Sequence, residues 1–285
     1  MEPPPLRDAE LRSLVERIKR KDCVLVLGPR VAVRPGDPDR RPLEELLACE
    51  ILSQTDVGPN EAALSSTNLR RAADLYLRLK RNDRVELELA VQDFYSRDAE
   101  QTTDFHVDLA ALPFKLCICA TPDDLMLHAY EKVGKAPQRG HYNFKEPARE
   151  TLSAPTPEKP LVYHLFGHHE DPESLVLSEM NLIDFIVAVV KGVPAVPDQV
   201  RSILKPDETS FLFLGFGFQH WYLRVLLRVF AIYNRPKLLA FEDAQFFDHP
   251  ENEEAIGFFS EQQVDFRPLR WDAFAKDLRR VYDAS

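Results

Sequence analysis

The sequence predicts an α/β fold in which helices cover a mostly parallel β-sheet. Short unbroken apolar runs alternate with longer stretches whose apolar residues recur every three or four positions. An unbroken run is typical of a strand buried on both faces, whereas the longer spacing marks one face of a helix. Repeated strand–helix alternation favours a parallel sheet, because parallel neighbours need a crossover connection.

The composition narrows the class of protein. The 285 residues carry 46 acidic and 36 basic side chains, a net charge of −10, and 45% of them are hydrophobic. Such a surface repels a phosphate backbone, so we expect no generic nucleic-acid binding. No apolar run reaches the roughly 18 residues that span a bilayer, and the first residues lack a signal-peptide profile. The sequence therefore predicts a cytoplasmic protein that does not bind membranes.

The first part of the chain predicts one helix, two strands and a long helical insertion. Leu11, Leu14, Val15 and Ile18 share one helix face in the sequence pattern, and residues 23–27 form the first buried strand. We expect a helical insertion at about 40–110 that roofs the carboxyl ends of the strands. Within it, the alternation over 85–95 fits either a helix or a strand. The second buried strand is expected at 115–120, followed by a helix at 123–131.

The second part continues the alternation after an irregular stretch. Residues 133–159 are rich in proline, glycine and charge, which predicts a flexible excursion. Further strands are expected at 161–166, 175–177, 210–214, 238–241 and 264–266, with helices at 179–191, after Gly217 and at the carboxyl end. We therefore expect a single domain over residues 1–285.

Ligands of parallel sheets bind beyond the carboxyl ends of the strands. Four such ends stand out here, at residues 28–30, 120–124, 166–169 and 215–219. The pair Asp123-Asp124 fits a helix cap better than catalytic carboxylates. The histidines at 164, 168 and 169 suggest either a metal cluster or ordinary polar loop residues, and the lack of nearby cysteine ligands favours the second reading.

Taken in order, these strand ends resemble those of the sirtuin-like (silent-information-regulator-like) Rossmann domain, in particular a divergent branch used in bacterial antiphage defence. The family's G-A-G-x-S loop falls on residues 28–32, and its T-T-N-Y-D-D-L-L motif falls on 119–126. Its H-G and P-E-S-x-V-L-T motifs fall on 166–178, and its L-F-x-G motif starts at 213. The resemblance implies a Rossmann-like sheet of the DHS-like NAD/FAD-binding type.

The chain departs from the family at the positions that carry catalysis. Thr121 stands at the position of the family's asparagine, and Phe166 at the position of its histidine. In the glycine loop, Arg30 replaces a glycine and Ala32 a serine. A phenyl ring cannot transfer a proton, so the resemblance implies impaired catalysis, a pseudoenzyme in which Thr121 and His164 are the remaining catalytic candidates.

The resemblance also implies a ligand: NAD or an ADP-ribose-type nucleotide, with no metal. The residues expected to bind it are Gly28, Pro29, Arg30, Val31, Thr121, Asp123, Phe166, Gly167, Gly215, Phe216 and Gly217. The zinc module of deacylase sirtuins is absent from the cysteine pattern, so protein deacylation is not expected.

Three functions follow from the resemblance. The first is a nucleotide-binding sensor, scaffold or regulatory subunit in antiphage defence, serving a TIR-, protease- or NTPase-type effector or forming a homo-oligomer. The second is an active NAD hydrolase that depletes NAD on infection. The third is a structural oligomerisation module with an empty pocket.

Overall fold

The computed structural model describes residues 8–20, 23–81, 83–97, 101–148, 151–204, 209–230, 232, 238–268 and 271–285. In these residues seven strands form one sheet in the order β3-β4-β2-β1-β5-β6-β7, and all neighbours are parallel. The strands are β1 (Cys23–Leu27), β2 (Leu116–Cys119), β3 (Gln138–His141), β4 (Leu161–His164), β5 (Ser210–Leu214), β6 (Leu238–Glu242) and β7 (Val264–Pro268). The predicted α/β, Rossmann-like class is confirmed.

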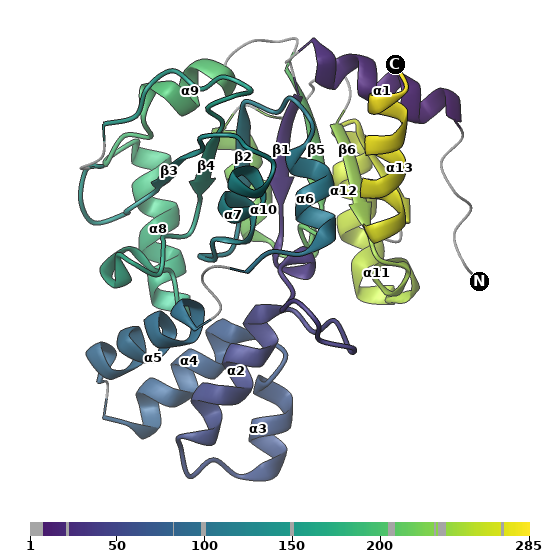
Figure 1. The fold of residues 1–285 in the computed structure, drawn as a ribbon. Helices are drawn as coiled ribbons and strands as arrows, with labels where there is room; N and C mark the ends of the chain where they lie inside the picture. Colours follow the sequence, from purple (N-terminus) through teal and green to yellow (C-terminus); the bar gives the residue numbers. More distant parts are fainter. Residues whose placement is uncertain are drawn as a thin grey trace.

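Helices cover both faces of the sheet. They are α1 (Asp8–Lys19), α2 (Leu43–Ser53), α3 (Pro59–Ser65), α4 (Leu69–Leu79), α5 (Arg84–Ser96), α6 (Asp104–Ala110), α7 (Leu125–Lys132), α8 (Glu179–Lys191), α9 (Asp198–Leu204), α10 (Tyr222–Val229), α11 (Ala244–Asp248), α12 (Glu253–Glu261) and α13 (Trp271–Asp283). One core unites the sheet with α8, α9, α10 and α12, and a second unites it with α1, α6, α7 and α13, which lie in front of the sheet in Figure 1.

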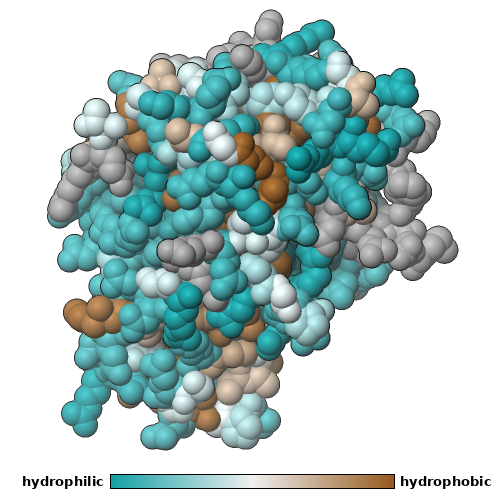
Figure 2. Space-filling view, in the orientation of Figure 1, coloured by the Kyte–Doolittle hydropathy of each residue, from teal (hydrophilic) through white to brown (hydrophobic). Residues whose placement is uncertain are grey.

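The central strands explain why the apolar runs are unbroken. Every residue of β1 and β5 is buried. Side chains of a strand alternate between its two faces, so Val24 and Val26 of β1 join one core while Leu25 and Leu27 join the other. Polar residues are instead found on the outside, and the face in Figure 2 is mostly hydrophilic with scattered apolar patches. Among the described helices, none combines the length and apolar character that crossing a bilayer requires.

Helices α2 to α5 form a separate small bundle beside the carboxyl ends of the strands (Figure 1). Their apolar faces enclose a third core, in which Leu47, Ile51, Tyr76 and Val91 have no exposed surface. The ambiguous stretch 85–95 is helical here. The side chain of Asp83 accepts the N–H of Glu86, a cap that starts α5.

Two local predictions were wrong. Strand β3 lies inside the expected excursion 133–159 and pairs with β4, because apolar residues between its prolines and glycines, including Tyr142 and Leu152, are buried in the sheet core. The short strand expected at 175–177 is absent. Its side chains are buried, but they divide between the sheet core and the bundle core.

The loops that follow β1 and β5 pack tightly against each other at Gly28. A Cβ there would lie 2.0 Å from Gly215 O and 2.2 Å from Phe216 Cα, both backbone atoms that cannot move aside cheaply. We expect Gly28→Ala to lower the free energy of unfolding by more than about 2 kcal/mol. The control is Gly257→Ala in α12, where nothing lies within 4 Å and alanine should add up to about 1 kcal/mol. Denaturant unfolding of both variants measures the difference; equal effects would contradict the packing argument.

Candidate functional site

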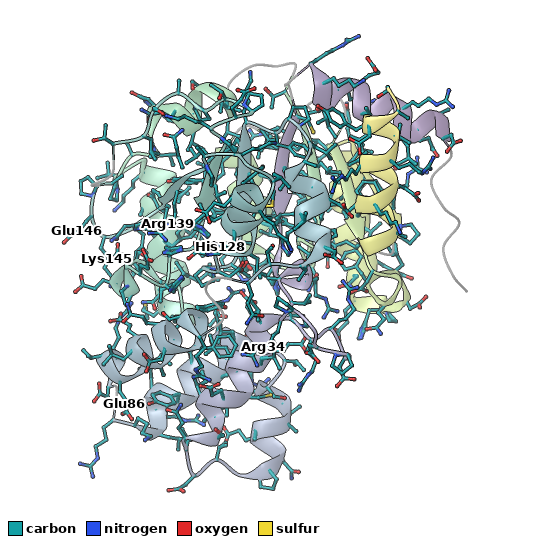
Figure 3. All side chains as sticks on the ribbon, viewed as in Figure 1. Arg34, Glu86, His128, Arg139, Lys145 and Glu146 are labelled. Atoms are coloured by element: carbon teal, nitrogen blue, oxygen red, sulfur yellow. The ribbon has the colours of Figure 1, made fainter. Side chains whose placement is uncertain are left out.

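The strand ends chosen from the sequence meet at one edge of the sheet. The carboxyl ends of β1, β2, β4 and β5 all face the bundle α2–α5 (Figure 1). The side chain of Arg34, labelled in Figure 3, lies between the sheet and the bundle. This edge therefore brings together the residues that were expected to bind a nucleotide.

The loop after β1 does not present a backbone cradle for phosphate. Residues 28–32 include one proline, which has no N–H, and every other N–H of the loop donates to a carbonyl of the chain itself. Gly28 N donates to Leu214 O at 2.9 Å, and Arg30 N donates to Gly215 O at 3.2 Å. A phosphate-binding loop needs amides that point outward to the anion. Here the amides hold the loops after β1 and β5 together instead.

The remaining group of this loop that could bind an anion is the side chain of Arg30. Its guanidinium lies between two carboxylates, with NH1 3.3 Å from Glu45 Oε1 and Nε 3.4 Å from Asp243 Oδ2. The side chain is 38% exposed. Arginine binds phosphate through paired N–H groups, so a phosphate at this position would compete with Glu45 and Asp243.

The second glycine loop, after β5, already holds a carboxyl group. Gly215 and Gly217 have φ values of 59° and 75°, a conformation that favours glycine. The N–H of Gly217 donates to Glu242 Oε1 at 2.9 Å. Glu242 ends β6 and is 1% exposed, and its burial raises the pKa of its carboxyl to about 8. The chain thus supplies its own acceptor to the loop.

The turn between β2 and α7 is closed around its polar residues. Thr121 is 3% and Asp123 8% exposed. Asp123 Oδ1 accepts the N–H of Leu125, the first residue of α7, at 3.0 Å, whereas the side chain of the N-cap residue Asp124 makes no capping hydrogen bond. Burial raises the pKa of Asp123. Asp123 also lines a cavity of about 20 Å³ with Tyr95 and Leu43. That volume suits about one water molecule and is too small for a nicotinamide ring.

Asp124 is the centre of a buried histidine cluster. Its Oδ1 accepts from His168 Nε2 at 3.1 Å, and its Oδ2 accepts from His169 Nε2 at 2.9 Å. Arg139 of β3, labelled in Figure 3, approaches Oδ2 at 3.6 Å. Burial alone would raise the pKa of Asp124, but the hydrogen bonds from both histidines outweigh it and hold that pKa well below its usual range. The cluster therefore contains a stable buried carboxylate.

His164 is held by an acceptor other than this carboxylate. A carbonyl can only accept, so His164 Nδ1–H donates to Thr121 O at 2.9 Å. Its Nε2 is therefore unprotonated, and it has no hydrogen-bond partner among the described residues. The side chain is fully buried, and burial lowers the pKa of its imidazole well below the usual value. His164 is thus a neutral, enclosed acceptor.

In a strand over 161–166, as the sequence predicted, His164 and Phe166 would point to the same face, but the strand is shorter than that. Strand β4 ends at His164, and the chain turns before Phe166. The Phe166 ring instead packs against Phe185 of α8 and Tyr222 of α10, with centroids 5.0 and 5.9 Å apart. The two side chains therefore contact different neighbours, and a catalytic role of His164 in place of the histidine missing at position 166 stays a prediction.

Three atoms of the cluster could together hold a metal ion. One ligand atom each from Asp124, His164 and His168 lies within 4.8 Å of the others. His168 Nδ1, however, accepts the N–H of Glu170 at 3.2 Å, which keeps the imidazole proton on Nε2. A metal at Nε2 would have to displace that proton. The sequence-based expectation of no metal stays a prediction.

The sequence reasoning did not single out Glu242, Arg139 or Arg70. Glu242 directly follows an apolar strand, so the rule that selected the other strand ends could have found it. Arg70 comes from the bundle, where no pattern marks it. Its NH2 donates to the Tyr222 hydroxyl at 2.9 Å, and its Nε lies 3.5 Å from Glu179 of α8. It links the bundle to the helices behind the sheet.

Glu242→Gln should change stability in a pH-dependent way. The carboxyl of Glu242 has a higher pKa in the folded than in the unfolded chain, so its neutral form favours the folded state. This stabilisation is fully present below the unfolded pKa of 4.5 and is lost as the pH rises through about 8. Glutamine keeps an oxygen for Gly217 N–H and never ionises. We expect the free energy of unfolding of the variant to exceed that of the natural chain by on the order of 3 kcal/mol at pH 9. Near pH 5 the two free energies should be equal. Denaturant unfolding at both pH values measures this; a pH-independent difference would refute it.

Asp124→Asn should disrupt the histidine cluster. The amide places N–H groups against histidine N–H donors and removes the charge that they share. We expect a loss of about 2–4 kcal/mol in unfolding free energy. Asp171→Asn is the matched control, because Asp171 also accepts from a histidine, His141, at 2.9 Å, yet its side chain is 39% exposed. Thermal and denaturant unfolding compare the two, and an equal cost would contradict the role given to burial.

Comparison with known proteins finds a family match over part of the chain. No curated protein matches the chain in sequence. The family model of the SIR2-like domain matches residues 123–262. This stretch runs from the turn before α7 to the end of α12 and includes the strands β3 to β6 with the loops that follow them. Such domains in general bind NAD-related nucleotides. Residues 123–262 therefore match the SIR2-like domain, in agreement with the sirtuin-like domain that the strand ends predicted.

Proposed function

We propose that this SIR2-like domain binds NAD or an ADP-ribose-type nucleotide at the carboxyl edge of its sheet without hydrolysing it at an appreciable rate. It would act as a sensor, scaffold or regulatory subunit. The observation that carries this proposal is the position of Phe166. Where the resemblance expects a histidine that moves a proton, a phenyl ring packs between Phe185 and Tyr222.

Among the described residues, two other histidines could take the place of the missing one, and the surroundings of both argue against it. His220 is stacked on Tyr222, with ring centroids 5.3 Å apart, and burial lowers the pKa of its imidazole to about 4. His164 is fully enclosed and bonded to the Thr121 carbonyl. The cavity beside Asp123 has no space for nicotinamide. These features argue against attack on the bond between nicotinamide and ribose.

Binding would depend on Arg30 rather than on backbone amides. The amides of the loop after β1 are engaged within the chain, whereas the Arg30 guanidinium is partly exposed between Glu45 and Asp243. A diphosphate has to displace these two carboxylates. We therefore expect affinity to be modest and to fall as salt is added.

The wider role rests on the resemblance. We propose that the domain belongs to a bacterial antiphage system, in which it serves a TIR-, protease- or NTPase-type effector. In such a role a bound nucleotide reports the state of the NAD pool, and the absence of turnover keeps the signal intact.

Calorimetric titration with ADP-ribose tests the binding. Arg30→Ala should lower the affinity at least 10-fold. Glu45→Gln should raise it several-fold, because the variant removes one competing carboxylate while keeping the size of the side chain. The control is Arg201→Ala, which removes an exposed guanidinium on α9 whose partner is Asp198. Equal affinities in the natural chain and the three variants would show that Arg30 does not bind the nucleotide.

Mass spectrometry of NAD incubated with purified protein tests the lack of turnover. We expect no nicotinamide above the level of the Arg30→Ala protein. If nicotinamide is released and the release disappears in both Thr121→Ala and His164→Ala, the domain is instead an NAD hydrolase. If neither nucleotide binds and none is cleaved, the proposal fails and a structural module takes its place.

A further inference from the structure

Helix α8 carries an exposed apolar stripe along its whole length. Met180, Ile183, Val187 and Val190 are 64%, 48%, 44% and 57% exposed. They recur at intervals of three, four and three residues, so they lie on one face of the helix. The opposite face packs against the rest of the chain, since Leu182, Phe185 and Val189 are buried in the sheet core. The exposed stripe is therefore not needed for packing within the chain.

The stripe is symmetric about the level of residue 185. Met180 and Val190 lie five residues to either side of that level, and Ile183 and Val187 lie two residues to either side. Phe185 itself points into the core and is fully buried. A two-fold axis that meets the stripe at this level would bring Met180 opposite Val190 and Ile183 opposite Val187 of an antiparallel copy. An isologous interface requires such self-complementarity.

The charges at the two ends of α8 obey the same symmetry. Glu179 lies six residues before the level of residue 185, and Lys191 lies six residues after it. An antiparallel copy would therefore place each Glu179 opposite a Lys191. In a parallel pair, by contrast, like charges would meet at both ends. The charges at the two ends of α8 thus favour an antiparallel over a parallel pair.

We propose that α8 is the contact through which two copies of this chain form a two-fold symmetric dimer. The two α8 helices pack antiparallel, with the apolar stripes at the centre and two Glu179–Lys191 pairs at the rims. A polar rim around an apolar centre is the usual anatomy of such interfaces.

Two more exposed apolar side chains lie near the ends of α8. Val193 follows α8 and is 70% exposed. At the other end, Trp221 is 55% exposed and its ring centroid lies 6.2 Å from that of Tyr222. Tyr222 shares Arg70 with Glu179. A single helix pair buries less than the roughly 1,200 Å² of a stable interface, so we expect dissociation on the order of micromolar.

The dimer contact also lies close to the proposed nucleotide edge. Glu179 pairs with Arg70, Arg70 bonds to Tyr222, and Tyr222 packs on Phe166. The dimer does not require a bound nucleotide, so the two proposals can be tested separately.

Sedimentation equilibrium of the whole chain over a range of concentrations tests the dimer. The mass should rise from 32.7 kDa toward twice that value. Val187→Glu should weaken association at least 10-fold, because it places two like charges beside the axis. Val85→Glu is the matched control, since Val85 is 65% exposed on α5, and it should leave the mass unchanged. Circular dichroism and thermal unfolding confirm that each variant folds.

A charge exchange tests the orientation. Glu179→Lys and Lys191→Glu should each weaken the dimer, and the double variant should restore it, since the double variant alone recreates opposite charges across the axis. A chain that stays monomeric at all concentrations overturns the proposal, as does a dimer unaffected by Val187→Glu. Failure of the double variant to restore association overturns the antiparallel register.

Discussion

The close contact between the loops that follow β1 and β5 is the constraint on which the rest of the site depends. The two central strands lie side by side, and Gly28 meets the backbone of Gly215 with no room for a Cβ. This contact uses the amides that a phosphate-binding loop would otherwise present, because Arg30 N and Gly28 N donate to carbonyls at the end of β5. The same contact directs the Arg30 side chain to Glu45 and Asp243.

Carboxyl groups of the chain satisfy most of the donors at this edge. Glu242 accepts from the glycine loop after β5, and Asp124 accepts from two histidines. Their ionisation differs because their donors differ: neutral amides do not offset the burial of Glu242, whereas two imidazoles and the nearby Arg139 stabilise the charge of Asp124. An edge whose donors are satisfied from within the chain is stable without a ligand.

The bundle α2–α5 connects this edge to the rest of the molecule. Arg70 of α4 contacts Tyr222 of α10, whose ring packs on Phe166, and Glu179 of α8. A nucleotide that moved the bundle would therefore change the contacts of Arg70 with α8. Arg70 thus connects the candidate site to the exposed face of α8 through direct contacts.

The sequence by itself determined the fold class and the sheet edge at which the candidate residues lie together. Runs such as residues 23–27 can be buried only in a strand with both faces covered, and strand ends lie at one edge of any parallel sheet. It did not determine β3, whose apolar residues are separated by prolines and glycines, or the separation of His164 from Phe166, which depends on where β4 ends. Only the tertiary structure decided that Arg30 N, Gly217 N and Asp124 find partners within the chain. Those hydrogen bonds join residues far apart in sequence, and no local pattern records which donor meets which acceptor.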